Sequence, residues 1–188
     1  MALTSHMVPL GTALPEATLP DLDGSPVNLA ELGSDRPLLV IFACNHCPYV
    51  KHLEDEIAVV AREAADQGVG VVAICSNDVE NYPDDDVAGL RDQVTRAGWA
   101  FPYLVDESQS VAHEFGAACT PDFFLYDASG ELAYRGAFDG STPGNGVPVT
   151  GELLREALRN VAAGSAVPEP HRPSMGCGIK WKTGNEPS

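Results

Sequence analysis

Two cysteines separated by two residues are the part of the sequence best suited to chemistry. Cys44 and Cys47 follow the apolar run PLLVIF, with His46 directly before the second cysteine and Pro48 directly after it. Such a pair can form a reversible disulfide, supply thiolate ligands to a metal, or provide the reactive thiolate of a peroxidase. The surrounding residues must decide among these three chemistries.

A buried strand and an amphipathic helix are expected to position the pair. The apolar run at 37–43 predicts a strand buried on both faces, and the apolar residues of 49–68 recur at helical spacing. Cys44 should therefore follow the strand and open the helix, with its sulfur exposed at the carboxyl edge of the sheet. Free N–H groups, the helix dipole and an imidazolium at His46 would favour its thiolate. We therefore expect Cys44 to attack substrates and Cys47 to resolve the mixed disulfide.

The other segments alternate between strand and helix patterns. Two hairpins are predicted, at 17–32 and 122–136, with turns at Asp23–Gly24 and Ser129–Gly130. This alternation indicates an α/β fold with a central mixed sheet flanked by helices, and an early Cys-x-x-Cys in it is typical of the thioredoxin-like fold. The remaining predicted strands and helices lie at 69–75, 84–98, 101–106, 108–116 and 150–164.

The sequence divides into a domain at 1–164, which includes the N-terminal hairpin, and a tail at 165–188. The tail is polar and rich in proline and glycine, yet it holds Ile179 and Trp181 close to Cys177. A disordered tail would have little use for such apolar side chains. We therefore expect the tail to pack back onto the domain.

Charge and composition exclude several classes of protein. The formal net charge of −16 over 188 residues lacks the basic surface of a nucleic-acid binder and would be repelled by anionic membranes. No run of about 18 apolar residues predicts a transmembrane helix, and the first residues do not resemble a signal peptide. We expect a cytoplasmic protein with reduced thiols, and the odd count of five cysteines also argues against a closed set of disulfides.

Three strings of residues together resemble a known family. They are CNHCPYVK at 44–51, CTPDFF at 119–124 and GCGIKWK at 176–182. Between Val8 and Lys182 the chain is similar to the thioredoxin superfamily, on the peroxiredoxin-like branch that contains the alkyl hydroperoxide reductase and thiol-specific antioxidant proteins. The resemblance implies a thioredoxin-like fold and redox chemistry at a Cys-x-x-Cys active site, and we expect no bound cofactor.

The resemblance also implies supporting roles near the dithiol. Thr120 and Pro121 stand where thioredoxin-like proteins place a cis-proline, whose neighbouring backbone holds a substrate chain in extended form beside the sulfurs. Cys119 precedes them and is a candidate redox partner or a small buried side chain. Cys177 is likewise a candidate redox thiol or a packing residue.

Comparison with peroxiredoxins favours disulfide exchange over peroxide reduction. Peroxiredoxins carry Pro-x-x-x-Thr-x-x-Cys, and alignment on Cys47 places Cys44 at the threonine and Val40 at the proline. Pro121 stands in place of their arginine, so two groups that polarise a peroxide are missing. We therefore expect a thiol-disulfide oxidoreductase that acts on protein or small-molecule disulfides and exchanges electrons with thioredoxin or another thiol reducing system. A thiol peroxidase or antioxidant protein that reduces peroxides is the alternative.

A metal chaperone is the third hypothesis. No second Cys-x-x-Cys and no His-x-x-x-His pair accompanies the dithiol, so we expect no metal. A metal would need Cys44, His46 and Cys47 with a fourth ligand drawn from His113, His171 and Cys177.

Two further segments bear on the site. The acidic run YPDDDV at 82–87 lacks the spacing of a calcium loop and is predicted to be a solvated loop and helix start. Leu38 stands where thioredoxins keep a buried aspartate, so the resemblance supplies no general base for Cys47.

Overall fold

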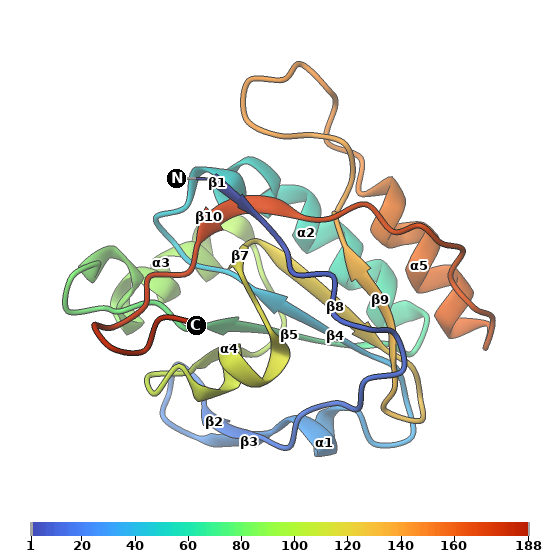
Figure 1. Cartoon of the computed structure of the whole chain (residues 1–188), viewed down its shortest axis with the longest axis horizontal. Helices are drawn as coiled ribbons and strands as arrows, with labels where there is room; N and C mark the ends of the chain where they lie inside the picture. Colours follow the sequence, from blue (N-terminus) through green and yellow to red (C-terminus); the bar gives the residue numbers. More distant parts are fainter. Residues whose placement is uncertain (1, 188) are drawn as a thin grey trace.

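A five-stranded mixed sheet forms the centre of the computed structural model, which describes residues 2–187 (Figure 1). The strands follow the order β6-β5-β4-β8-β9 across the sheet. The first three strands are mutually parallel, and β8 runs antiparallel to both β4 and β9. The expected α/β architecture with a mixed central sheet is confirmed. The bounds are β4 (Leu38–Phe42), β5 (Gly70–Cys75), β6 (Tyr103–Val105), β8 (Asp122–Tyr126) and β9 (Leu132–Gly136).

Helices cover both faces of this sheet. Alternate residues of β4 point to opposite faces, so Leu39 and Ile41 enter one apolar core and Leu38, Val40 and Phe42 enter the other. The first core is closed by α2 (Pro48–Asp66), α3 (Val87–Ala97) and α5 (Glu152–Ala162), and the second by α1 (Leu29–Leu32) and α4 (Ser110–Phe115).

The start of α2 lies three residues later than an opening at Cys44 requires. Pro48 is the first helical residue and Cys47 is the N-cap, in an extended conformation. Proline favours this position because its fixed φ suits a helix and its missing N–H is not needed there. The expectation that Cys44 opens the helix is therefore wrong, and it is Cys47 that lies at the free N–H groups of the helix.

Both predicted hairpins are present, with one change at the first. β2 (Thr18–Pro20) pairs with β3 (Pro26–Asn28), and β8 pairs with β9. The end of the predicted 17–32 hairpin instead forms the short helix α1, because the Asn28 side chain caps it by accepting the Glu31 N–H.

The C-terminal tail contributes a strand to a second, three-stranded sheet. In this sheet β10 (Met175–Gly178) lies between β1 (Ala2–Thr4) and β7 (Cys119–Thr120), so a strand near the C-terminus pairs with one at the N-terminus (Figure 1). Ile179 enters the second core, and the Trp181 ring lies 4.4 Å from the His113 ring. The tail therefore packs back onto the domain as expected, whereas β1 and β7 were not predicted.

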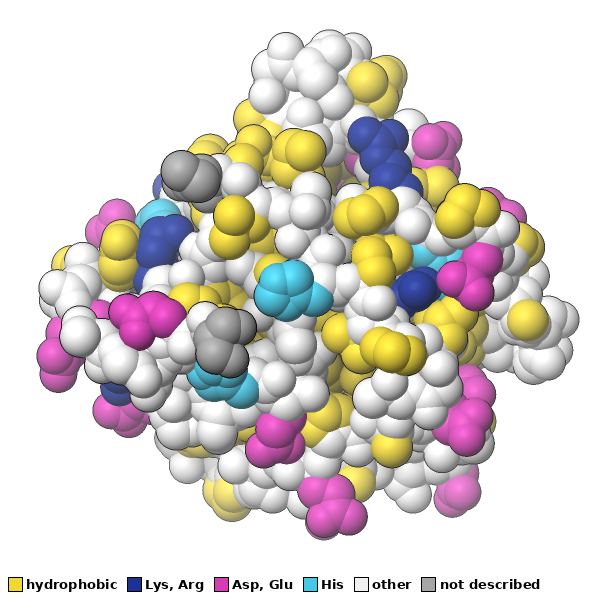
Figure 2. Space-filling view, in the orientation of Figure 1, with side chains coloured by type: hydrophobic (Ala, Val, Ile, Leu, Met, Phe, Trp, Pro, Cys, Tyr) yellow, Lys and Arg dark blue, Asp and Glu magenta, His cyan; other side chains and the backbone are white. Residues whose placement is uncertain are grey.

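On the face of the molecule that Figure 2 shows, acidic and apolar side chains lie in different places. Figure 2 shows acidic side chains spread around its rim and hydrophobic side chains nearer its middle. Leu3 on β1 and Met175 on β10 are among its large exposed hydrophobic residues. Across residues 2–187, no helix is long and apolar enough to cross a membrane.

Candidate active site

The two cysteines of the dithiol lie inside the protein. Cys44 stands two residues beyond β4 and Cys47 caps α2, and both residues are 0% exposed. The expectation of an exposed Cys44 sulfur is therefore wrong. Cys44 belongs to a loop that folds toward the interior. A hydrogen bond from the Gln93 side chain to the Cys44 carbonyl oxygen, at 3.2 Å, fixes the backbone of this loop.

Thr120 joins the two sulfurs from the opposite side. Its hydroxyl lies 3.4 Å from Cys44 Sγ, and its carbonyl oxygen lies 3.1 Å from Cys47 Sγ, where it can accept from the thiol. The peptide bond between Thr120 and Pro121 is cis. The structure thus brings the segment that was expected to support the dithiol into direct contact with it.

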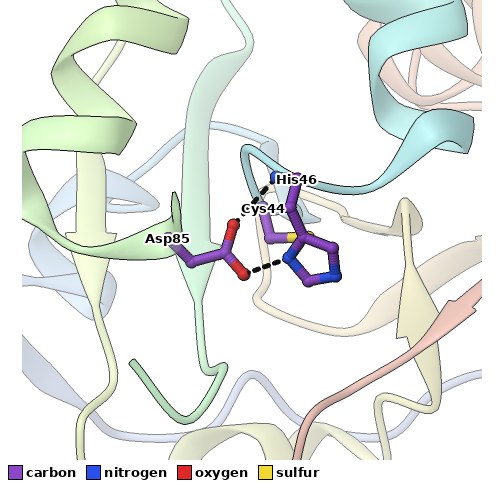
Figure 3. Close-up of side chains that lie close together, drawn as sticks. All are labelled: Cys44, His46 and Asp85. Atoms are coloured by element: carbon purple, nitrogen blue, oxygen red, sulfur yellow. Dashed lines mark hydrogen bonds and ion pairs between the residues drawn. The ribbon is translucent and has the colours of Figure 1, made fainter. Parts of the chain in front are cut away.

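Asp85 is a buried member of the site that the sequence did not reveal. Its Oδ1 accepts the backbone N–H groups of Asn45 at 2.8 Å and His46 at 2.9 Å, and its Oδ2 accepts from the Asn77 amide at 2.8 Å. His46 Nδ1 lies 2.5 Å from the same Oδ2 (Figure 3). Asp85 is 1% exposed, so the prediction that the 82–87 run is solvated is wrong at this residue.

Asp85 is buried where a turn meets a distant loop of the chain. The 3₁₀ turn η1 (Pro83–Asp85) precedes α3 and folds its last residue toward the loop between β4 and α2. Three consecutive aspartates in the sequence gave no signal that one of them enters the core, because its partners are backbone groups about 40 residues earlier in the chain.

His46 bridges the carboxylate and the first cysteine. Its Nδ1 lies 3.9 Å from Cys44 Sγ, much farther than from Asp85, and its ring stacks on Tyr82 at 5.4 Å between centroids. Figure 3 shows the imidazole directed at the Asp85 carboxylate, with Cys44 behind the pair. The expected position of His46 beside Cys44 is found, but its stronger partner is Asp85.

The surroundings of Cys47 favour its thiolate. A hydrogen bond from Cys44, further ones from Thr120 and Cys177, and the backbone N–H of Val50 lower the pKa of Cys47 to about 4, against the opposing effect of burial. The Thr120 carbonyl oxygen favours the protonated thiol instead, but it is a single acceptor against several donors. The helix N-terminus adds to the same preference for the thiolate.

Cys44 is held in the opposite state. Its hydrogen bond to Cys47 raises its pKa well above the ordinary value, and burial and the nearby Asp85 carboxylate raise it further. The two sulfurs therefore share one proton, which stays on Cys44. This electrostatic order is the reverse of the one expected from the sequence, because the helix start belongs to Cys47.

The other buried cysteines are less reactive. Burial raises the pKa of Cys75 to about 12 and raises that of Cys119 further. The Cys119 sulfur faces the Pro121 carbonyl oxygen at 3.8 Å. Neutral, buried thiols are poor nucleophiles, so Cys119 has the environment of a packing residue.

Cys177 has a different place, on β10 directly opposite Thr120. It packs against the core that contains both dithiol cysteines, yet it is only partly buried. Burial and the neighbouring Cys47 raise the pKa of Cys177 to about 11. Cys177 is thus the third thiol of the site.

The donors gathered at Cys44 do not suit a metal. Cys44, His46 and Asp85 have ligand atoms within 4.8 Å of one another. Both Asp85 oxygens, however, already accept two N–H donors each, which identifies this carboxylate as an orienting group. His113 and His171 bind elsewhere, to the Asn185 carbonyl oxygen at 2.7 Å and to the Arg135 guanidinium at 2.8 Å.

Asp122 is a second buried carboxylate that the sequence did not reveal as unusual. It follows Pro121 at the start of β8 and is 0% exposed. Its Oδ2 accepts the Ala118 N–H, whereas Oδ1 has no hydrogen-bond partner within residues 2–187. Burial raises the pKa of Asp122 to about 8.

Comparisons with known proteins agree with this architecture. The sequence pattern of the Redoxin family matches residues 9–152. An uncharacterized conserved protein from Geobacillus kaustophilus is 45% identical, with 97% of each chain covered and a TM-score of 0.93. A hypothetical protein from Sinorhizobium meliloti is 45% identical, with 96% of this chain and 99% of that chain covered and a TM-score of 0.93. No curated protein matches the chain.

More distant structures share the fold. A secreted Mycobacterium tuberculosis disulfide oxidoreductase homologous to Escherichia coli DsbE is 20% identical, with 77% and 95% of the chains covered and a TM-score of 0.60. The peroxidoxin BcpB from the same organism is 20% identical, with 82% and 96% covered and a TM-score of 0.61. The fold is therefore thioredoxin-like, common to disulfide oxidoreductases and peroxiredoxin-like proteins.

Proposed function

The chain belongs to the Redoxin family, and from that premise we propose that it is a thiol-disulfide oxidoreductase in which Cys44 and Cys47 form the redox-active disulfide. The observation that carries the proposal is the unequal pair of thiols. One sulfur belongs to the N-cap residue of a helix and is favoured as a thiolate by its neighbours, and the other keeps the shared proton. Nucleophilic attack needs the first kind of sulfur, and resolution of a mixed disulfide needs a second thiol within reach.

The proposed reaction begins at Cys47. Its thiolate attacks one sulfur of a substrate disulfide, and the other substrate sulfur leaves as a thiolate. Cys44 then loses its proton and attacks Cys47 Sγ, which forms the Cys44–Cys47 disulfide and releases the second substrate thiolate. The substrate is reduced by two electrons and the dithiol is oxidised by two.

The departing substrate thiolate is the proposed acceptor of the Cys44 proton. The His46–Asp85 pair positions Cys44 for this step, because His46 Nδ1 donates to the Asp85 carboxylate and lies 3.9 Å from Cys44 Sγ. The pair therefore acts on the second step of the exchange.

The proposed partners follow from the same chemistry. Substrates are disulfides, and the oxidised enzyme is returned to the dithiol by thioredoxin or another thiol reductant. We place this cycle in the cytoplasm, where thiols are kept reduced.

Peroxide reduction is the second candidate, and one observation favours it. Cys47 aligns with the reactive cysteine of peroxiredoxins, and it is the sulfur held as a thiolate. The Thr120 hydroxyl, 3.4 Å from Cys44 Sγ, returns to the site a hydroxyl that the sequence motif lacks. In this reaction the Cys47 thiolate attacks one peroxide oxygen, the O–O bond breaks and the other oxygen leaves as water or an alcohol. The resulting sulfenic acid condenses with Cys44 to give the disulfide and water.

The two candidates are tested by parallel turnover of a small disulfide and hydrogen peroxide. Wild type should exchange the disulfide faster than it reduces the peroxide. In Cys47→Ser the rates of both reactions should fall at least about 100-fold. Cys75→Ala, which changes a buried thiol outside the site, is the matched control and should keep its activity. Full activity of Cys47→Ser would refute the proposal, and a peroxide rate above the disulfide rate would select the second candidate.

A further inference from the structure

The edge of β7 that lies beside the dithiol is already occupied. The resemblance assigns the backbone next to Pro121 to an extended substrate chain. In this structure β10 pairs with β7 there, antiparallel, with Cys177 opposite Thr120 and Gly178 opposite Cys119. A peptide that adds itself to a sheet edge uses the same backbone hydrogen bonds. The C-terminal strand therefore takes the place of a substrate strand.

Two features hold β10 in this place. A side chain at Gly176 would collide with the Thr120 carbonyl oxygen, so glycine permits the close approach of β10 to β7. On its other edge β10 pairs with β1, where Ala2, Leu3 and Thr4 face Cys177, Gly176 and Met175 in turn.

This arrangement gives the three thiols different access to solvent. Cys44 and Cys47 are 0% exposed, whereas Cys177 is only partly buried. Cys177 lies beside Cys47, and burial together with Cys47 raises the pKa of Cys177 to about 11, an effect that the positive charge of Lys180 opposes. Cys44 and Cys177 both neighbour Cys47, and of these two it is Cys177 that a reductant in solution can reach.

We propose that Cys177 is a third redox thiol of this site, which accepts the disulfide from the buried pair and exposes it to an external thiol reductant. The inference rests on the proposed dithiol function and adds the route by which the oxidised enzyme is reduced. β10 then occupies the position of a substrate strand and supplies Cys177 as the reacting thiol. An extended polypeptide disulfide can reach Cys47 only after β10 has separated from β7. Small disulfides and peroxides are the favoured oxidants.

The relay step balances without a further oxidant. The Cys177 thiolate attacks Cys47 Sγ in the Cys44–Cys47 disulfide, and Cys44 leaves and takes up the proton that Cys177 lost. The disulfide now joins Cys47 and Cys177. An external thiol then attacks Cys177 Sγ and Cys47 leaves as a thiolate, and a second external thiol frees Cys177 by attacking the mixed disulfide. Two external thiols become one disulfide, and all three cysteines are restored.

The first test uses Cys177→Ser and measures the two halves of the cycle separately. The serine hydroxyl can still donate to Cys47, so oxidation of the reduced protein by a small disulfide should slow much less than reduction of the oxidised protein by glutathione, which should slow at least about tenfold. Cys119→Ala, a buried neighbour on β7, is the matched control and should change neither rate. If Cys177→Ser is reduced as fast as wild type while Cys47→Ser remains inactive, the relay is wrong and the dithiol function stands. If Cys47→Ser is also fully active, the dithiol function itself fails.

The second test moves β10 by single methyl groups. Gly176→Ala must displace the strand from the Thr120 carbonyl oxygen, whereas Gly178→Ala meets only the flexible end of the Leu3 side chain at 2.8 Å. Gly176→Ala should alkylate faster at Cys47 and gain activity on an extended peptide disulfide, and Gly178→Ala should behave as wild type.

A third test looks for the proposed disulfide directly. In Cys44→Ser, one equivalent of diamide should link Cys47 to Cys177, as mapped by mass spectrometry. Absence of that link, or equal peptide activity in both alanine variants, would overturn the proposal.

Discussion

The two ends of the dithiol have opposite environments although they lie three residues apart. Cys47 caps a 19-residue helix and is surrounded by donors from Cys44, Cys177 and the helix backbone. Cys44 lies in the loop before the helix, buried beside the Asp85 carboxylate. The same thiol group is therefore stabilised as an anion at one end and as a neutral acid at the other. The difference shows that backbone position and neighbouring charge, more than residue type, assign the roles in this pair.

The largest expected effect is an asymmetry in trapping. The double variant Cys44→Ser, Cys177→Ser lacks both thiols that could resolve an adduct and keeps hydroxyls beside Cys47, so it should form a stable mixed disulfide through Cys47 with a small disulfide. Cys47→Ser removes the thiolate, so trapping through Cys44 should be at least about 100-fold slower at neutral pH. Mass mapping of the adducts measures both. Equal trapping by the two variants would mean that the two ends do not differ.

The next effect concerns Asp85, the charge that distinguishes the Cys44 end. Asp85→Asn removes a negative charge near Cys44, so the pKa of Cys44 should fall and the two thiols should become more alike. The NH2 group of the introduced asparagine would also face N–H donors that now point at a carboxylate oxygen, which should lower the free energy of unfolding by roughly 1–3 kcal/mol. Titration of the thiols and thermal unfolding measure the two effects. An unchanged Cys44 pKa in a folded variant would contradict the role given to this carboxylate.

Local patterns in the sequence predicted the framework well. The buried runs of β4 and β5 and the helical spacing of α2 are visible within short windows, and the resemblance placed Thr120 and Pro121 beside the dithiol. The start of α2 was also readable, since proline at the first helical position marks it at Pro48. That signal was outweighed by the expectation that the first cysteine opens the helix.

Long-range pairing explains what the sequence did not predict. Asp85 is buried only because η1 meets the backbone of Asn45 and His46, about 40 residues earlier. Likewise β1 exists as a strand only because β10, at the other end of the chain, pairs with it. Neither segment carries a local pattern that distinguishes it from a solvated loop.

A smaller effect separates Asp85 from the other buried carboxylate, Asp122. The pKa of Asp122 is raised to about 8, above its unfolded value of about 3.9, so the stability contributed by its protonated form is lost as the pH rises from 4 toward 8. Asparagine does not titrate, so the melting temperature of Asp122→Asn should fall less than that of wild type between pH 4 and pH 8. We expect the two falls to differ by a few degrees. Parallel pH dependences of the two melting temperatures would show that Asp122 is not protonated in the folded protein.

Titration of the thiolate by its ultraviolet absorbance tests the central claim most directly. Reduced wild type, Cys44→Ser and Cys47→Ser are compared from about pH 3 to about pH 10, a range that spans the ordinary thiol pKa of about 8.5. The account predicts a thiolate that forms far below this value in wild type and in Cys44→Ser, with a wild-type pKa close to the value of about 4 given by the hydrogen bonds to Cys47. In Cys47→Ser this low-pH thiolate should be absent. A low-pH thiolate that persists in Cys47→Ser and disappears in Cys44→Ser would contradict the account.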